Sequence, residues 1–265
     1  MAKLNNDFTF TGSVGGLTAY KRRDSDKIIL RQKGGPSKSQ IKKSPAFVRV
    51  RENNAEFGGR ATATKWIRQA IWPQKSLADY GFTSSLNSLM KPIQELDTVS
   101  KRGNRSVLFT KNPGLLNGFN LNRRNIFDSI IRHPVKFVVS KESLSASVNI
   151  PALIPGINFM VPGKQVMYSI ITALGVLPDL HYTVKGYAPN KIYKNQAWAA
   201  KAETSWYPVL SGSPAETIEL KLDVVPPDKS FCLLLSIGIR FGTIAAGGAI
   251  EQVKYAGAAK ILTVV

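Results

Sequence analysis

Residues 27–71, KIILRQKGGPSKSQIKKSPAFVRVRENNAEFGGRATATKWIRQAI, join a charged arm to a segment with helical periodicity. The first part of this stretch, residues 27–51, contains eight Lys or Arg residues and no Asp or Glu. Such a run repels itself and cannot bury a core alone, so we expect it to meet an anionic partner or a neighbouring subunit. The breaker cluster GGPS at residues 34–37 predicts a turn within the arm.

The helical pattern begins at Ser44, a residue type that caps helices, with Pro45 at the first helical position. Spacing of three and four residues predicts one buried stripe, formed by Phe47, Val50, Phe57, Ala61, Thr64 and Ile71. The pair Gly58 and Gly59 lowers helix propensity by roughly 1–2 kcal/mol, so we expect a kink or a closely packed neighbour there. Glu56 and its polar neighbours argue against a deep core position for this part of the helix.

Charge is unevenly distributed along the 265 residues, whose net charge is +19. Residues 1–140 have a net charge of +16, whereas residues 141–265 have a net charge of +3. This segregation concerns partners rather than fold, and it favours a polyanion or an acidic surface as the partner of the first half. The hydrophobic fraction of 43% is sufficient for a large core.

From residue 135 onward the pattern changes to short alternating segments separated by Pro- and Gly-rich turns. The candidate strands are residues 135–139, 144–150, 166–174, 182–187, 197–206, 217–225, 231–241 and 258–265. About eight strands at this spacing are typical of an antiparallel β-sandwich, jelly-roll-like or Ig-like. The last strand runs to the final residue, where it could pair with an edge of its own sheet or of a neighbour's.

We therefore predict an α+β protein with three parts. Residues 1–43 form a basic extended arm with a short β-ribbon, residues 44–134 are mostly helical, and residues 135–265 form the β-sandwich. Within the helical part, the sequence predicts helices near residues 83–96 and 120–131 and a short strand at 107–109.

The sequence offers no recognisable catalytic centre. His133 and His181 belong to no metal-binding motif, and the lone Cys232 lies in an apolar run typical of a buried small hydrophobe. No nucleophile motif, dinucleotide fingerprint or P-loop is present. We expect no enzyme activity, no metal and no cofactor. Without a secretory signal or an apolar segment of about 20 residues, the expected location is the cytoplasm.

The candidate contacts to a partner are the basic residues of the arm and of the following helix. They are Lys33, Lys38, Lys42, Lys43, Arg49, Arg51, Arg60, Lys65 and Arg68. Tyr20, Phe47 and Trp66 lie beside basic residues, so they could stack on nucleic-acid bases or anchor the arm against protein.

The segment KGGPSKSQIKKSPAFVRVRENNAEFGG, residues 33–59, resembles a group of uncharacterised proteins from Bacteroidetes bacteria. The shared features are a Gly-Gly-Pro-Ser-Lys arm, a Ser-Pro-x-Phe helix start and an Asn-x-x-Glu-Phe-Gly core. The segment VKYAGAAKI, residues 253–261, is also similar to the end of these proteins. The resemblance implies a bacterial protein and no particular activity.

Two functions fit these observations. In the first, the protein is a structural subunit that assembles with copies of itself into a filament, tube or shell through the arm and β-strand edges. In the second, the basic half binds DNA or RNA by neutralising phosphates. A shell with basic arms facing nucleic acid would combine both, and adhesion or carbohydrate binding by the sandwich is a further alternative.

Overall fold

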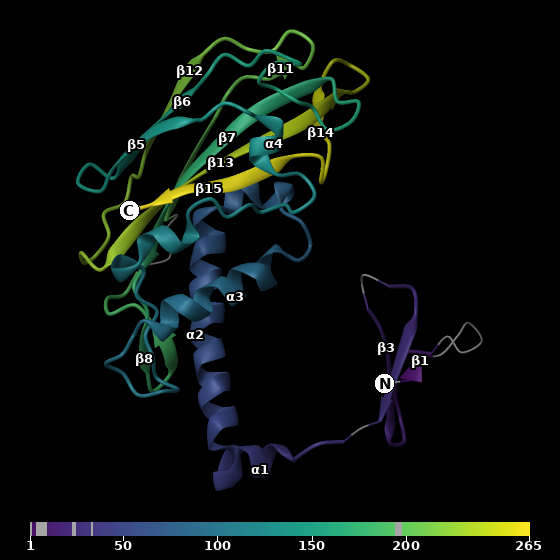
Figure 1. Cartoon of the computed structure of the whole chain (residues 1–265), viewed down its shortest axis with the longest axis vertical. Helices are drawn as coiled ribbons and strands as arrows, with labels where there is room; N and C mark the ends of the chain where they lie inside the picture. Colours follow the sequence, from purple (N-terminus) through teal and green to yellow (C-terminus); the bar gives the residue numbers. More distant parts are fainter. Residues whose placement is uncertain (1, 4–9, 23–24, 33, 194–197) are drawn as a thin grey trace. The chain divides into compact units, whose positions relative to one another are not determined.

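The structure is a computed structural model that describes residues 2–3, 10–22, 25–32, 34–193 and 198–265. The chain divides into two compact units, Met1–Arg51 and Glu52–Val265, which we call the N-terminal unit and the body. Helices and antiparallel sheets together confirm the α+β class (Figure 1). Within the described ranges, no helix has both the length and the apolar character that crossing a membrane requires.

The N-terminal unit contains a small antiparallel sheet rather than the predicted two-stranded ribbon. Its strands are β1 (Ala2–Lys3), β2 (Gly12–Val14), β3 (Leu17–Lys21) and β4 (Ile28–Gln32), in the order β1-β4-β3-β2. Strands β3 and β4 pair along their full length.

A short helix, α1 (Lys38–Lys43), follows the predicted turn. The Ser37 side chain accepts a hydrogen bond from the Gln40 N–H, and the Gln40 side chain accepts one from the Ser37 N–H, which forms a capping box. Pro45 then opens the 3-10 turn η1 (Pro45–Phe47), at the first helical position as predicted, and α2 (Val48–Ala70) continues the chain into the body.

The buried side of α2 agrees with the predicted stripe at Thr64 and, just after the helix, at Ile71, but differs from it elsewhere. Its buried residues are Glu56, Gly59, Ala63, Thr64, Ile67 and Ala70, whereas Phe57 is 54% exposed and Val50 is 39% exposed. The reason is close packing, because a Cβ on Gly175 of the large sheet would collide with Ala70. The close approach to the large sheet therefore requires a small side chain at Ala70, while Ile67 of the same helix packs into the core.

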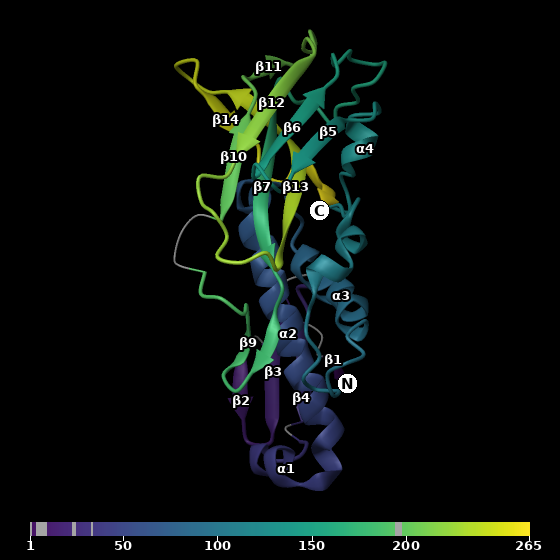
Figure 2. The ribbon, with the colours of Figure 1, turned by 90° about the vertical axis from the view of Figure 1, so that its left-hand side faces the viewer.

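The body contains two antiparallel sheets that face each other, as predicted for a sandwich (Figure 2). The large sheet has the order β10-β7-β13-β14, with β11 added to β7 and β15 added to β13, and the small sheet has the order β12-β6-β5. Their strands are β5 (Lys136–Ser140), β6 (Ser145–Ile150), β7 (Met167–Pro178), β10 (Ala199–Glu203), β11 (Tyr207–Pro208), β12 (Glu216–Lys221), β13 (Phe231–Ile244), β14 (Ile250–Gln252) and β15 (Ala258–Val264).

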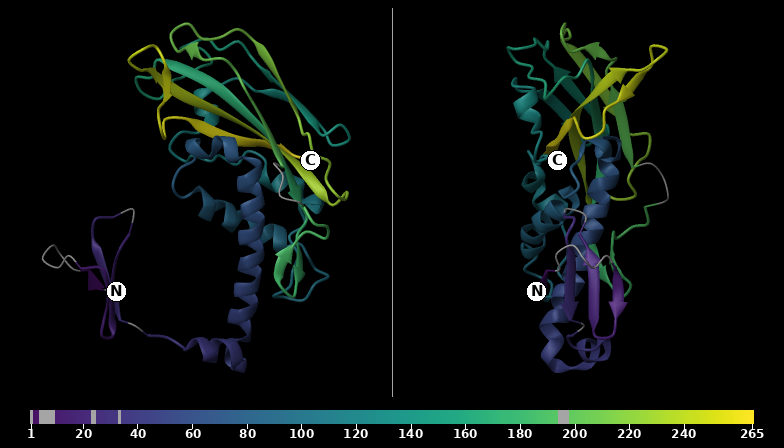
Figure 3. Two further views of the ribbon diagram at one scale, coloured as in Figure 1. Left: turned by 180° about the vertical axis from the view of Figure 1, so that it is seen from behind. Right: turned by 90° about the vertical axis from the view of Figure 1, so that its right-hand side faces the viewer.

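Two hydrophobic cores lie on opposite faces of the large sheet. One fills the space between the sheets and includes Val148 of β6, Leu174 of β7 and Leu235 of β13. The other lies between the large sheet and the helices and includes Ile67 of α2 and Leu234 of β13 (Figure 3). Because β7 and β13 are covered on both faces, their sequences are continuous apolar runs instead of alternating patterns.

The helical layer is shorter and more irregular than predicted. It contains η2 (Trp72–Leu77), α3 (Phe82–Glu95), η3 (Phe109–Lys111), η4 (Pro113–Leu116) and α4 (Phe127–Ile130). The helix predicted at 120–131 is reduced to α4, and the strand predicted at 107–109 is one isolated bridge between Val107 and Leu180. Tertiary hydrogen bonds to β15 and to the hairpin β8 (His181–Thr183) and β9 (Gly186–Ala188) replace local structure here.

The final strand pairs within its own sheet, which is one of the two pairings expected for it. Strand β15 pairs with β13 on one side. On its other side, the Gly118 N–H donates to Ile261 O, the Ile261 N–H donates to Phe119 O, and the Leu121 N–H donates to Ala259 O. Both edges of β15 are therefore hydrogen-bonded within the body, which leaves this strand no edge for a neighbour.

Candidate functional site

The basic residues predicted for the arm are mostly displayed on the N-terminal unit. Lys33 lies outside the described residues. Lys38, Lys42 and Lys43 are on α1, which has no buried residue, and within the described parts of the chain none of the three forms an ion pair. Arg49 is exposed at the start of α2.

Arg51 has a structural position. Its guanidinium donates hydrogen bonds to Ile41 O at 2.8 Å and to Ser44 O at 2.9 Å. These are carbonyls at the end of α1, which the helix itself leaves unpaired. Two of the five guanidinium donors therefore stabilise the corner between α1 and α2 and are not available to a partner.

The remaining three predicted residues, Arg60, Lys65 and Arg68, lie on the part of α2 that belongs to the body. Lys65 and Arg68 are exposed, whereas Arg60 is half-buried. Arg60 lines a cleft in the body, and none of the other seven predicted residues that the structure describes does so.

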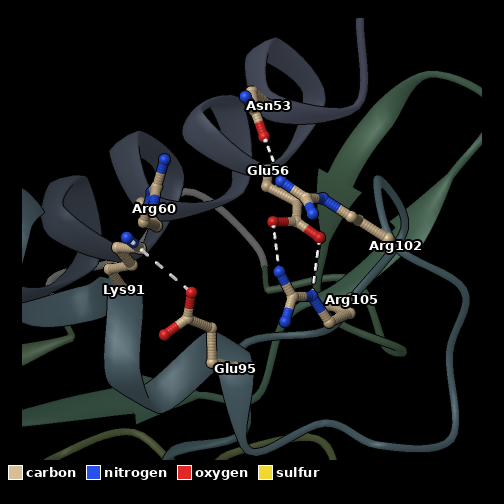
Figure 4. Close-up of a pocket in the computed structure, with 7 residues that line it drawn as sticks. All are labelled: Asn53, Glu56, Arg60, Lys91, Glu95, Arg102 and Arg105. Carbon is tan, nitrogen blue, oxygen red and sulfur yellow. Dashed lines mark hydrogen bonds and ion pairs between the residues drawn. The ribbon is translucent and has the colours of Figure 1, made fainter. Parts of the chain in front are cut away.

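The cleft lies where α2, α3 and the loop 97–106 meet, and it has a volume of about 480 Å³ (Figure 4). Its lining is made of charged and amide side chains: Asn53, Glu56, Arg60, Lys91, Glu95, Arg102 and Arg105. Four cations and two carboxylates give this lining a net charge of +2.

Glu56 and Arg105 form the buried centre of the cleft wall. Arg105 Nε donates to Glu56 Oε1 at 2.7 Å and Arg105 Nη2 donates to Glu56 Oε2 at 2.8 Å, while the Gly103 N–H donates to Oε1 at 2.9 Å. The hydrogen bonds from Arg105 hold the pKa of Glu56 below its ordinary value, although burial opposes this shift. The positive charge of Arg105 compensates the carboxylate of Glu56, which explains how this polar segment of α2 can be buried, against the expectation from the sequence.

The loop that carries Arg102 and Arg105 is fixed by Asp97. Its carboxylate accepts hydrogen bonds from the N–H groups of Val99 at 3.0 Å, Ser100 at 3.1 Å and Ser106 at 2.8 Å. Burial alone would raise the pKa of Asp97, but these hydrogen bonds outweigh burial and hold the pKa well below its usual range. The loop is thereby closed on itself with both arginines aimed at α2.

The hairpin β8–β9 supports the same region through Tyr187. A Cβ on Gly59 would come within 2.7 Å of the Tyr187 ring, so only glycine allows this contact. The Tyr187 hydroxyl accepts a hydrogen bond from Gln94 Nε2 at 3.3 Å and donates to Gly103 O at 3.4 Å. Burial, with the nearby Glu56 charge, raises the pKa of Tyr187 to about 12. This close contact is one of the two outcomes expected for the glycine pair.

The other cleft cations have weak or incomplete partners. Lys91 Nζ is 3.9 Å from Glu95 Oε1, and Arg102 Nη2 donates to Asn53 Oδ1 at 3.0 Å. Arg60 Nε is buried and has no hydrogen-bond partner among the described residues, and its guanidinium lies 5.8 Å from the centre of the Phe57 ring. An unpaired buried donor beside an excess of positive charge is suited to an anion.

The sequence did not single out five of the six charged residues that line the cleft. The signal for Arg102 and Arg105 was the basic turn KRGNR at residues 101–105. Glu56 could have been noticed as a carboxylate in a helix segment whose pair Gly58 and Gly59 predicts a closely packed neighbour. Outside the cleft, few reactive or metal-binding side chains are available. Burial raises the pKa of the Cys232 thiol to about 12. Among the described residues, no group of His, Cys, Asp and Glu could hold a metal ion.

Comparison with known proteins adds no relative: no family model, no curated protein and no solved structure matches this chain.

Proposed function

We propose that the protein is a structural subunit that assembles with copies of itself into a filament, tube or shell, and that the N-terminal unit is the element that reaches the neighbour. The observation that carries this proposal is the apolar face of the four-stranded sheet in the N-terminal unit. A subunit whose sheet cannot cover its own apolar face needs another surface to do so.

The strand register defines this face. Residues directly opposite in an antiparallel pair point to the same side of a sheet. Val14 is opposite Leu17, Ala19 is opposite Leu30, and Lys21 is opposite Ile28. This face carries Val14, Leu17, Ala19, Ile28 and Leu30, with Lys21 and Gln32 at its margins, and we call it the apolar face. The other face carries Ser13, Thr18, Tyr20, Ile29 and Arg31.

The sheet has almost no core of its own. In the described residues of the N-terminal unit, the buried apolar side chains are Ala19 and Ile29, while Val14 is 65% exposed and Leu17 is 43% exposed. Burial of Ala19 and Ile29 stabilises the folded N-terminal unit by about 3 kcal/mol, whereas ordering each backbone residue costs about 1 kcal/mol. Cover by a second copy would supply the missing burial, and it would repeat at every subunit of a polymer.

A strand edge offers a second contact. Strand β5 is last in the order β12-β6-β5, so one of its edges has no strand partner among the described residues. Its Val138 is 67% exposed. Exposed edges with β-branched residues accept strands from other chains.

The test compares two double variants by sedimentation velocity. Val14→Asp with Leu17→Asp puts charge on the apolar face, and Ser13→Asp with Thr18→Asp puts the same charge on the opposite face of the same strands. We expect the full-length protein and the second variant to sediment as large species and the first variant to sediment at the monomer mass of 29.0 kDa. Equal large species for all three proteins would reject the apolar face as the assembly contact.

A second candidate function is binding of a polyanion such as DNA or RNA by the N-terminal unit. The supporting observation is α1, which presents Lys38, Lys42 and Lys43 without a buried residue or an acidic residue in its first turn. The whole unit contains twelve Lys or Arg and three Asp or Glu, a net charge of +9 in 51 residues. Such density favours phosphate neutralisation with release of counterions.

This candidate is tested by a salt titration of duplex DNA binding. Changing the three α1 lysines to Gln should lower the slope of log K against log salt by up to about 3, because each lost phosphate contact removes about 0.9. The control changes the exposed Lys185, Lys221 and Lys229 of the body to Gln and alters net charge equally. The same slope for both variants would show that net charge and not α1 determines binding.

A further inference from the structure

One end of the sandwich has no charged residue across three segments of the chain. Residues 143–163, 204–215 and 241–250 contain no Asp, Glu, Lys or Arg, although one residue in five of the whole chain is charged. In a protein of net charge +19, such segments are the places where a second copy meets no like charge.

The strand register brings the loop parts of these segments, residues 151–163, 209–215 and 245–249, to the same end of the body. Met167, at the start of β7, is opposite Pro208 of β11 and Gly242 of β13. Ile150, at the end of β6, is opposite Glu216 at the start of β12. The connecting loops therefore lie together, where β11 and β14 are seen in Figures 1 and 2. We call this surface the uncharged end after the three segments, although the exposed Lys164 lies beside it, between residue 163 and Val166.

The uncharged end displays large apolar side chains. Their exposed fractions are 48% for Ile154, 70% for Ile157, 47% for Val166, 93% for Leu210 and 60% for Ile244. Grouped exposure of this kind marks an interaction surface, in contrast to single exposed apolar residues.

The loops of the uncharged end are held in place from inside. The Ile154 N–H donates to Asn158 Oδ1 at 2.7 Å, and Asn158 Nδ2 donates to Ala152 O at 2.8 Å. The Leu153 N–H donates to Ser213 O at 2.9 Å, which joins the loop before β7 to the turn that carries Leu210. An ordered apolar surface loses little entropy when it binds, which favours association.

The occupant that fits is the apolar face of the N-terminal unit of a second copy. That unit has a net charge of +9, so a surface rich in cations would repel it, whereas the three segments of the uncharged end contribute no cation. The cores of protein interfaces are depleted in charged residues in the same way. Val14 and Leu17 of the N-terminal unit are exposed apolar side chains, and so are Ile157 and Leu210 of the uncharged end. Contact between the two surfaces would bury both pairs.

We propose that subunits join head to tail, with the apolar face of one N-terminal unit seated on the uncharged end of the next subunit's sandwich. This inference rests on the proposed self-assembly, and it names the surface that receives the N-terminal unit. Because the two surfaces are different, the contact is heterologous, and it produces an open filament or a closed ring.

The experiment uses two full-length double variants, each with one damaged surface. Val14→Asp with Leu17→Asp damages the apolar face, and Ile157→Asp with Leu210→Asp damages the uncharged end. Val184→Asp with Val225→Asp is the matched control, since both side chains are at least 80% exposed and lie near the other end of the β7–β13 pair, where Pro178 is opposite Phe231. Circular dichroism establishes that each variant is folded before its mass is measured.

Each damaged variant alone should sediment as a monomer, and the control should form the same large species as the unmodified chain. An equimolar mixture of the two damaged variants retains one intact contact, because the face of one copy can still bind the end of the other. The mixture should therefore form a dimer of twice 29.0 kDa and stop there.

The outcomes separate the two proposals. If the damaged apolar face gives monomers and the damaged end still gives large species, the receiving surface is wrong and self-assembly through the N-terminal unit stands. If the mixture remains monomeric, the two surfaces do not bind each other and the head-to-tail contact is overturned. If neither damaged variant changes the large species, the N-terminal unit is not the linker and the proposed function itself is rejected.

Discussion

Arg105 neutralises the buried carboxylate of Glu56 through two parallel hydrogen bonds of 2.7 and 2.8 Å, although the two residues are 49 positions apart in the sequence. The side chain of Glu56 is 6% exposed and that of Arg105 is 18% exposed. A paired charge of this kind contributes little net free energy, but removal of one partner leaves the other charge buried and unpaired. The pair therefore fixes the loop 97–106 against α2.

Arg105→Leu should lower the free energy of unfolding by about 3 kcal/mol, because it leaves Glu56 uncompensated. The double variant Glu56→Leu with Arg105→Leu should be less destabilised than the single variant. Urea denaturation at pH 7 measures both. Equal destabilisation in the two variants would mean that packing of the Arg105 stem, and not its charge, stabilises the loop.

Gly59→Ala should destabilise the body by about 1–3 kcal/mol, because the added methyl group meets the Tyr187 ring, which packing and hydrogen bonds hold in place. The matched control is Gly58→Ala, where a Cβ meets nothing within 4 Å. That variant should stabilise by up to about 1 kcal/mol through helix propensity. Thermal unfolding compares them, and opposite signs for neighbouring glycines are the expected result.

Adding Tyr187→Leu to Gly59→Ala should recover part of the loss, because the smaller side chain makes room for the methyl group. Full additivity of the two single changes would contradict a direct clash between these residues.

Acid should reduce stability through Asp97, whose pKa is lower in the folded chain than in the unfolded chain, where it is about 3.9. Its contribution is present above the unfolded pKa and is lost as the pH falls through the folded pKa, because the unfolded state binds the proton first. Asp97→Asn should cost about 1–3 kcal/mol at pH 7 through weakened hydrogen bonds to the loop. The difference in free energy of unfolding between Asp97→Asn and the unmodified chain should become smaller from pH 5 to pH 2, as measured by urea denaturation at each pH.

The cleft should bind inorganic phosphate through Arg60, whose Nε lacks an internal partner among the described residues. Ligand binding to the folded state raises the melting temperature, with a gain of about 2.7 kcal/mol at a hundredfold excess over Kd. Phosphate also stabilises proteins non-specifically, so the comparison is between variants. Arg60→Met should lose part of the phosphate-induced shift, whereas Arg68→Met, exposed on the same helix, should keep it. An equal shift in both variants would exclude Arg60 as a ligand.

The strands of the sandwich were predictable because their pattern is local. Alternation in residues 144–150 predicted that Leu144, Ala146, Val148 and Ile150 share one face; the last three are buried and Leu144 is half-buried against the same core. The apolar run around Cys232 predicted burial of the thiol, which is confirmed. The α+β class followed from the change of periodicity near residue 135, and the region near α3 was recognised from its own apolar spacing.

The cleft was less accessible to prediction. Arg60 was among the nine candidate residues, but Lys91 of α3 and Arg105 of the loop were not, because nothing local connects them with α2. Arg51 was chosen for its charge, and the structure uses its donors on Ile41 and Ser44. A sequence identifies charged hydrogen-bond donors, but it does not show whether those donors bind groups of the same protein or remain available to a partner.

The sequence by itself determined the strand-rich second half, the basic first half and the burial of residues whose period matches their own element, since those properties depend on neighbours a few positions away. Tertiary structure alone decided which side of α2 is buried, because that choice depends on how closely Ala70 can approach Gly175. It also decided that β15 is paired on both edges and that three segments without charged residues meet at one end of the sandwich. These features depend on strand register and on contacts between residues far apart in the chain, which no local pattern encodes.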